Sequence, residues 1–190
     1  MNRLARLMAI IGGLVLVGLV VLTSVSVLGR GGNTFGHGDF LTSVAPGLAE
    51  ALINTGIGPV KGDFELVEAG IAFAIFAFLP LCQLHGGHAT VDVFTSYLPG
   101  RINRVLVTFW EVILTAVIVL ISWRLFAGLQ GKFGNGEITY ILQFPVWYAY
   151  AASFAASLVA ALVGIYCAAA RVIGLISGRP VLPATGGAGH

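Results

Sequence analysis

The chain has 190 residues, enough for one domain of ordinary size, but its composition excludes an ordinary soluble protein. Hydrophobic residues make up 57% of it and charged residues 9%, whereas soluble domains carry roughly 25% charged residues. The ten basic residues are spread along the chain without forming a patch, which argues against nucleic acid as a partner.

Long stretches with few or no charged residues predict membrane-spanning helices, because about 20 apolar residues cross the roughly 30 Å of a hydrocarbon core. The predicted spans are residues 7–29, 64–84, 104–129 and 145–172. The uncharged stretch at 138–170 exceeds one crossing, so Pro145 is expected to open the fourth helix. The sequence therefore predicts an all-α integral membrane protein with one four-helix domain over residues 1–176.

The first span has a second interpretation as a cleaved signal peptide. Arg3 and Arg6 precede the apolar run, and Ser24-Val25-Ser26 offers small residues near its end. The run is longer than the apolar region of a signal peptide, which has about 7–15 residues. Its length favours a membrane-spanning helix.

The distribution of basic residues predicts that both termini lie in the cytoplasm, since Lys and Arg gather on that side of a membrane. The segments assigned to the inside carry Arg3, Arg6, Arg101, Arg104, Arg171 and Arg179, and those assigned to the outside carry Arg30, Lys61 and Lys132. Residues 30–63 then form an outer loop and 85–103 an inner loop. Short helices are expected at 46–53 and 90–97, and residues 177–190 are expected to be a disordered cytoplasmic tail.

Charged residues inside the spans are costly and therefore candidates for function. Glu111 lies about two helical turns from Arg104 and can reach back to it or to a partner protein. Arg124 and Glu68 lie at similar depths near the outer ends of their spans, so we expect an ion pair between them. The alternative is that each side chain reaches the interface separately. The span centres carry no charge, which argues against an ion pathway through this chain alone.

A polar cluster from His85 to Asp92 follows the second span. Two histidines, His85 and His88, and one aspartate could bind a transition metal, but three ligands without a cysteine or a further carboxylate favour a structural role. No histidine lies in mid-span to hold a haem. Cys82 and Cys167 lie far apart in apolar runs and are expected to be packing residues. We therefore expect no metal and no other cofactor on this chain.

Small residues recur every four positions along the fourth span. One row is Ala152, Ala156, Ala160, Gly164 and Ala168, and a second is Ala149, Ser153, Ser157 and Ala161. Rows of this kind let helix backbones approach closely in lipid. We expect part of this surface to pack within the four helices and part to leave room for a second neighbour, such as another subunit.

Several motifs within residues 60–170 resemble those of one family: GDFELVE and LPLCQL at the two ends of the second span, HATVDV followed by Leu-Pro, and FPVWY at the entry of the fourth span. Among the motif residues are Glu65, Glu68, His88, Asp92, Pro99, Pro145 and Trp147. Together the motifs resemble the small membrane (Q, DctQ-type) subunit of tripartite ATP-independent periplasmic (TRAP) transporters.

The resemblance implies one part of a bacterial uptake system in the inner membrane. In that family a periplasmic binding protein captures an organic acid, such as a dicarboxylate, and a large membrane (M) subunit moves it with a sodium gradient. The small subunit would be a non-catalytic scaffold without a substrate site. The chain agrees in offering no mid-membrane polar cage. Its outer loop, residues 30–63, is longer than the short connection of the family.

Two other classes remain open at this point. A membrane anchor subunit of a redox enzyme complex would use His85 and His88 as haem ligands. A small self-assembling channel is favoured by the rows of small residues and disfavoured by the uncharged span centres.

Overall fold

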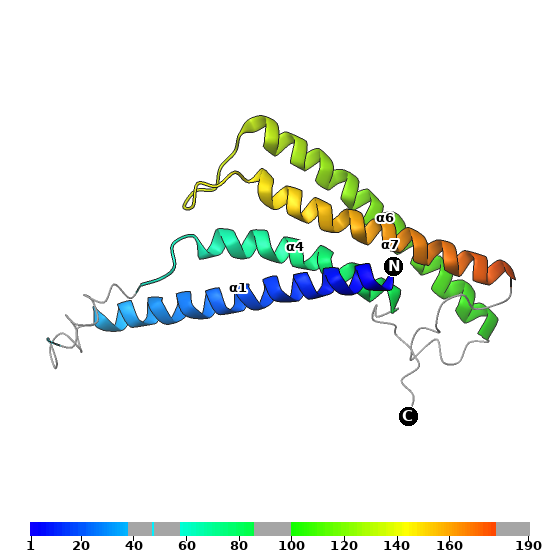
Figure 1. The fold of residues 1–190 in the computed structure, drawn as a ribbon, viewed down its shortest axis with the longest axis horizontal. Coiled ribbons are helices and arrows are strands. Elements are labelled where there is room, and N and C mark those ends of the chain that lie inside the picture. Colours follow the sequence, from blue (N-terminus) through cyan, green and yellow to red (C-terminus); the bar gives the residue numbers. More distant parts are fainter. Residues whose placement is uncertain (38–46, 48–57, 86–99, 178–190) are drawn as a thin grey trace, which may run out of the picture.

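The computed structural model describes residues 1–37, 47, 58–85 and 100–177, and the chain folds into four long helices (Figure 1). These are α1 (Asn2–Gly36), α4 (Asp63–Leu84), α6 (Gly100–Asn135) and α7 (Trp147–Ser177). Each is long and apolar enough to cross a membrane, which confirms the predicted fold class. Apart from residue 47 and Ser177, which ends α7, the expected helices at 46–53 and 90–97 and the expected tail lie outside the described residues, as do His88, Asp92 and Pro99.

All four helices are longer than their predicted spans, and α1 and α6 exceed them the most. α1 continues through residues 30–36, which were expected to belong to the outer loop, and α6 already begins at Gly100 and ends at Asn135. At 1.5 Å per residue the two helices measure about 52 and 54 Å, well beyond the roughly 30 Å of a hydrocarbon core. Hydropathy identifies the part of a helix that suits lipid, whereas backbone hydrogen bonding decides where the helix ends.

α7 is the central helix of the molecule. α1 packs against α4, α6 packs against α7, and the two antiparallel pairs meet where α4 packs against α7. The pairs lie close together at one end and splay apart at the other, where α1 and α6 end and α4 and α7 begin (Figure 1). We call the splayed end the outer end, following the predicted orientation.

The small residues of α7 are used for contacts within the chain. Ala156, Ala160 and Gly164 of the first row are buried, as are Ser153, Ser157 and Ala161 of the second. Ala160 and Ala161 form a core cluster with Ile118 of α6 and Leu79 of α4. The second neighbour expected for these rows is thus another helix of the same chain. The buried positions are not available to a partner subunit, whereas Ala152 is exposed and Ala168 is half-buried.

The connection between α6 and α7 is a small hairpin at the outer end (Figure 1). Ile138 and Pro145 form an antiparallel bridge, and Thr139 N–H donates to the Phe144 carbonyl at 2.9 Å. Pro145, expected to open the fourth helix, lies in this hairpin, and α7 begins two residues later at Trp147. The Trp147 ring stacks on Tyr148 with 4.1 Å between ring centroids, so aromatic side chains gather beside the hairpin.

Candidate functional site

A buried ion pair joins the inner parts of α6 and α7. Glu111 Oε2 lies 3.2 Å from Arg171 Nε, and the two side chains are only 5% and 11% exposed. Arg104, the intrachain partner considered for Glu111, is exposed and forms no ion pair with it. A separation of seven residues leaves Arg104 about 10 Å away along the same helix, whereas packing brings α7 alongside. The pair therefore fixes α6 to α7 within the bundle.

A second polar contact links three helices. Gln83 of α4 donates through Nε2 to Thr115 Oγ1 of α6 at 3.0 Å, and Thr115 Oγ1 donates to the Gly164 carbonyl of α7 at 3.2 Å. Gln83 is fully buried. It lies so close to α7 that a Cβ on Gly164 would stand 2.9 Å from its amide atoms. The sequence analysis did not single out Gln83. A glutamine inside an apolar helix could have marked this position as a polar contact, but its partners follow only from the packing of the helices.

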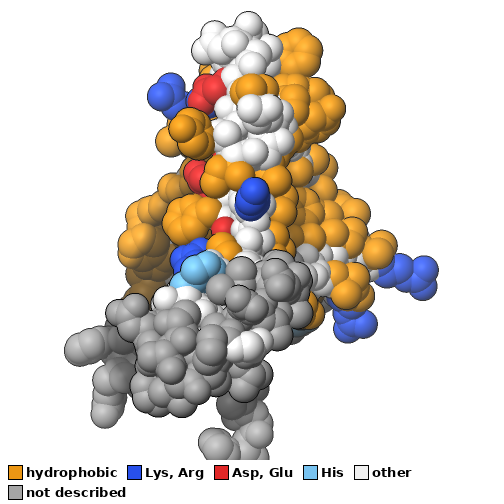
Figure 2. Space-filling model, turned by 90° about the vertical axis from the view of Figure 1, so that its left-hand side faces the viewer, with side chains coloured by type: hydrophobic (Ala, Val, Ile, Leu, Met, Phe, Trp, Pro, Cys, Tyr) orange, Lys and Arg blue, Asp and Glu red, His pale blue; other side chains and the backbone are white. Residues whose placement is uncertain are grey.

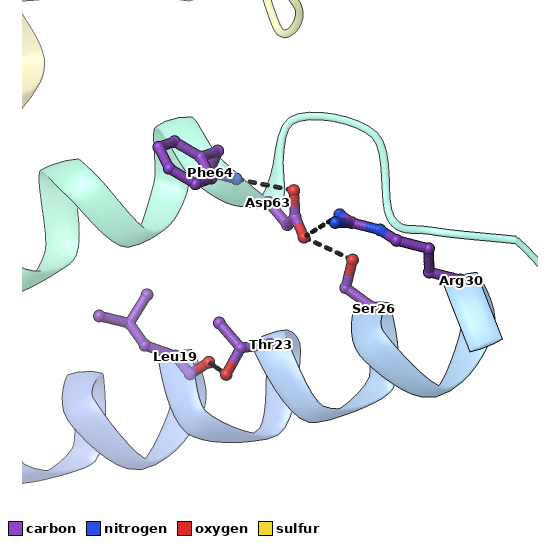
Figure 3. Close-up of polar contacts among 6 residues, drawn as sticks. All are labelled: Leu19, Thr23, Ser26, Arg30, Asp63 and Phe64. Atoms are coloured by element: carbon purple, nitrogen blue, oxygen red, sulfur yellow. Dashed lines mark hydrogen bonds and ion pairs between the residues drawn. The ribbon is translucent and has the colours of Figure 1, made fainter.

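At the outer end, Asp63 ties α4 to α1 (Figure 3). The Ser26 hydroxyl donates to Asp63 Oδ2, and the Arg30 guanidinium lies 3.8 Å from the same oxygen. The other carboxylate oxygen accepts the Phe64 N–H at 2.8 Å, which satisfies a free donor in the first turn of α4. Sequence reasoning did not pair Ser26 with Asp63, because 37 positions separate them.

Glu65 docks the α6–α7 hairpin onto α4. Its two carboxylate oxygens accept the N–H groups of Ile141 at 2.6 Å and Leu142 at 2.9 Å. The Leu142 side chain also covers Gly62, which has φ of +78° and precedes α4. A side chain at Gly62 would be strained and would overlap Leu142. The GDFELVE motif therefore holds α4 to α1 through Asp63 and to the hairpin through Glu65.

The expected ion pair between Glu68 and Arg124 is absent from the structure. The ion pairs among the described residues are Arg30–Asp63, Lys132–Glu137 and Arg171–Glu111. Both Glu68 and Arg124 are exposed. Equal depth does not bring them together, because α4 and α6 both pack on α7 and splay apart at the outer end.

An outer groove of about 550 Å³ lies between α4, α6, α7 and the hairpin. Its lining comprises Glu65, Glu68, Ala69, Ala72, Phe76, Leu125, Lys132, Glu137, Ile138, Thr139, Tyr140, Phe144, Val146, Ala149, Tyr150 and Ser153. Seen from this end, acidic side chains appear as separate spots among hydrophobic ones (Figure 2). The groove is thus a mixed polar and apolar hollow at the outer end.

The histidine cluster is only partly described. His85 follows α4 and is exposed, with Nδ1 3.0 Å from the Leu81 carbonyl oxygen. Within residues 1–37, 47, 58–85 and 100–177, no group of three His, Cys, Asp or Glu side chains is placed to hold a metal ion. Cys82 and Cys167 are not joined in a disulfide.

Replacing Glu65 with glutamine is expected to loosen the hairpin. The change removes a charged acceptor from two backbone N–H groups, and hydrogen bonds to a charged acceptor are stronger than those to a neutral one. Amide exchange at Ile141 and Leu142, measured by NMR in micelles, should accelerate severalfold. Glu68→Gln is the matched control, because Glu68 does not bond the hairpin. Equal exchange rates in both variants would contradict the assigned role of Glu65.

Comparison with known proteins identifies the family. The family model described as "Tripartite ATP-independent periplasmic transporters, DctQ component" matches residues 54–174. This range contains α4, α6 and all but the last three residues of α7, together with Glu65, Glu111 and the groove. No curated protein and no solved structure shows significant similarity to the chain. The match covers more than half of the chain, which therefore belongs to the DctQ family, the small permease subunits of TRAP transporters.

Proposed function

We propose that this chain is the scaffold subunit of a sodium-coupled transporter that takes up organic acids, such as dicarboxylates, across a bacterial inner membrane. A periplasmic binding protein delivers the substrate, and a large membrane subunit moves it. This chain is non-catalytic and packs beside the large subunit. Membership in the DctQ family is the observation that carries the proposal.

The use of polar groups inside the bundle supports a scaffold role. Glu111 bonds Arg171, and Gln83, Thr115 and Gly164 form one chain of hydrogen bonds. Substrate and ion sites of secondary transporters instead use broken helices whose ends converge near the midplane. The four described helices run unbroken from end to end, and these polar groups join one helix to the next.

The apolar surface of α1 supports lateral packing in the membrane. α1 packs mainly against α4, so much of its surface is left uncovered. Large apolar side chains along it are widely exposed, including Leu14 at 68%, Val17 at 60% and Leu28 at 74%. In a bilayer such a surface contacts lipid or another membrane protein, and the proposal assigns part of the apolar surface to the large subunit.

Reconstitution in proteoliposomes tests the function. We expect uptake of a radiolabelled organic acid only when this chain, the large subunit, the binding protein and an inward sodium gradient are all present. Dissipating the gradient with a sodium ionophore is the control for coupling. Undiminished uptake without this chain would contradict the scaffold role, and uptake by this chain alone would contradict the whole proposal.

A further inference from the structure

We propose that the outer groove binds the headgroup of an ethanolamine phospholipid, with the primary ammonium at Glu68 and Ser153. The proposal rests on the groove itself and does not depend on the transport function. Four observations carry it: a carboxylate without a partner among the described residues, a buried hydroxyl likewise without one, aromatic lining residues, and apolar lining residues at the outer end of the helices.

The charges in the groove favour a cation. Its lining contains three carboxylates, those of Glu65, Glu68 and Glu137, and one basic side chain, that of Lys132. Glu65 already accepts two backbone N–H groups, and Glu137 is paired with Lys132. Glu68 has no ion pair or hydrogen bond with the described residues, and Arg124 does not line the groove. One carboxylate therefore remains for a cation from outside the chain.

The other lining groups favour a primary ammonium over a quaternary one. Ser153 is only 4% exposed, and its Oγ has no hydrogen-bond partner in the part of the chain that the structure describes. An ammonium group carries three N–H donors, enough to reach a carboxylate and a hydroxyl together, whereas a choline group carries none. Phe76, Phe144 and Tyr150 supply aromatic rings that attract either cation. Hydrogen bonding to Ser153 and Glu68 therefore discriminates between the two headgroups.

The position of the groove favours a lipid as the source of the ammonium. It lies beside the hairpin where Trp147 and Tyr148 stack, and aromatic side chains of this kind collect at headgroup level. Ala72, Phe76 and Leu125 provide an apolar surface for an acyl chain. Lys132 also lines the groove, and its ammonium, which uses one of its three N–H donors on Glu137, has donors left for the phosphodiester. A zwitterionic headgroup on an apolar tail matches all of these features.

Native mass spectrometry of the full-length protein, delipidated in detergent, tests the assignment. With equal amounts of dioleoyl-phosphatidylethanolamine and dioleoyl-phosphatidylcholine, the protein should retain roughly tenfold more of the ethanolamine lipid, the effect of one charge-assisted hydrogen bond. Glu68→Gln should lose this preference, and Ser153→Ala should reduce it several-fold. Arg124→Gln is the matched control and should keep the full preference. Unchanged melting temperatures in the same detergent would show that the variants fold.

Several results would overturn the proposal. One is equal retention of the two lipids by the unmodified protein. Another is a preference for the ethanolamine lipid that stays unchanged in both Glu68→Gln and Ser153→Ala. Displacement of the lipid by equimolar free phosphoethanolamine would assign the groove to a soluble amine instead. If the co-purified large subunit excluded the ethanolamine lipid, and if Glu68→Gln weakened the association of this chain with that subunit, the groove would instead be assigned to a basic side chain of a partner protein.

Discussion

Replacing Glu111 with alanine is expected to destabilise the helix bundle by roughly 3–5 kcal/mol, the usual cost of removing one partner from a buried ion pair. The Arg171 guanidinium, which is 11% exposed, would lose the carboxylate that lies 3.2 Å away. The measurement is the free energy of unfolding in mixed micelles, followed by circular dichroism across a denaturant titration.

The exposed ion pair of Lys132 and Glu137 is the matched control for this experiment. Its side chains are 30% and 47% exposed, so Glu137→Ala should cost at most about 1 kcal/mol. Replacing both Glu111 and Arg171 with methionine should recover much of the lost stability, since no buried charge is then left without a partner. A Glu111→Ala cost no larger than that of Glu137→Ala would show that the buried pair does not hold α6 to α7.

Replacing both Ala156 and Ala160 with leucine is expected to separate the helices around α7 and to abolish assembly of the bundle. Both alanines are fully buried, and Ala160 belongs to a core cluster with Ile118 of α6, against which Leu79 of α4 packs. Overpacking costs about 1–3 kcal/mol for each added bulky side chain in a close-packed core. The measurements are the unfolding free energy and the yield of cross-links between cysteines introduced on α4 and α7.

Ala152→Leu is the control for these substitutions, because Ala152 belongs to the same row of small residues but is exposed. We expect it to leave bundle stability within about 0.5 kcal/mol of the unmodified protein. If Ala152→Leu were as harmful as the buried pair of substitutions, the damage would come from the added apolar volume rather than from contacts inside the bundle. A stable bundle that carries both Ala156→Leu and Ala160→Leu would contradict the packing described for α7.

The sequence alone was sufficient for the fold class and the family. The uncharged runs at 7–29 and 138–170 are long enough to cross lipid as helices, which bond the backbone polar groups within the segment itself. The uncharged run at 69–84 likewise locates α4. The bounds of α4 differ from the predicted span, 64–84, by a single residue. Motif residues such as Glu65 and Trp147 were sufficient to identify the family, which the match over residues 54–174 confirms.

Only the tertiary structure decided which groups meet. Sequence specifies the depth of a residue in the membrane, but rotation about the helix axis and the order of helices depend on packing. Glu68 and Arg124 were predicted at similar depths but form no ion pair with each other, because their helices splay apart at the outer end. Glu111 instead meets Arg171, because the small residues of α7 let α6 approach closely. Contacts between helices depend on side-chain shape at the packed surface, and hydropathy and spacing do not encode that shape.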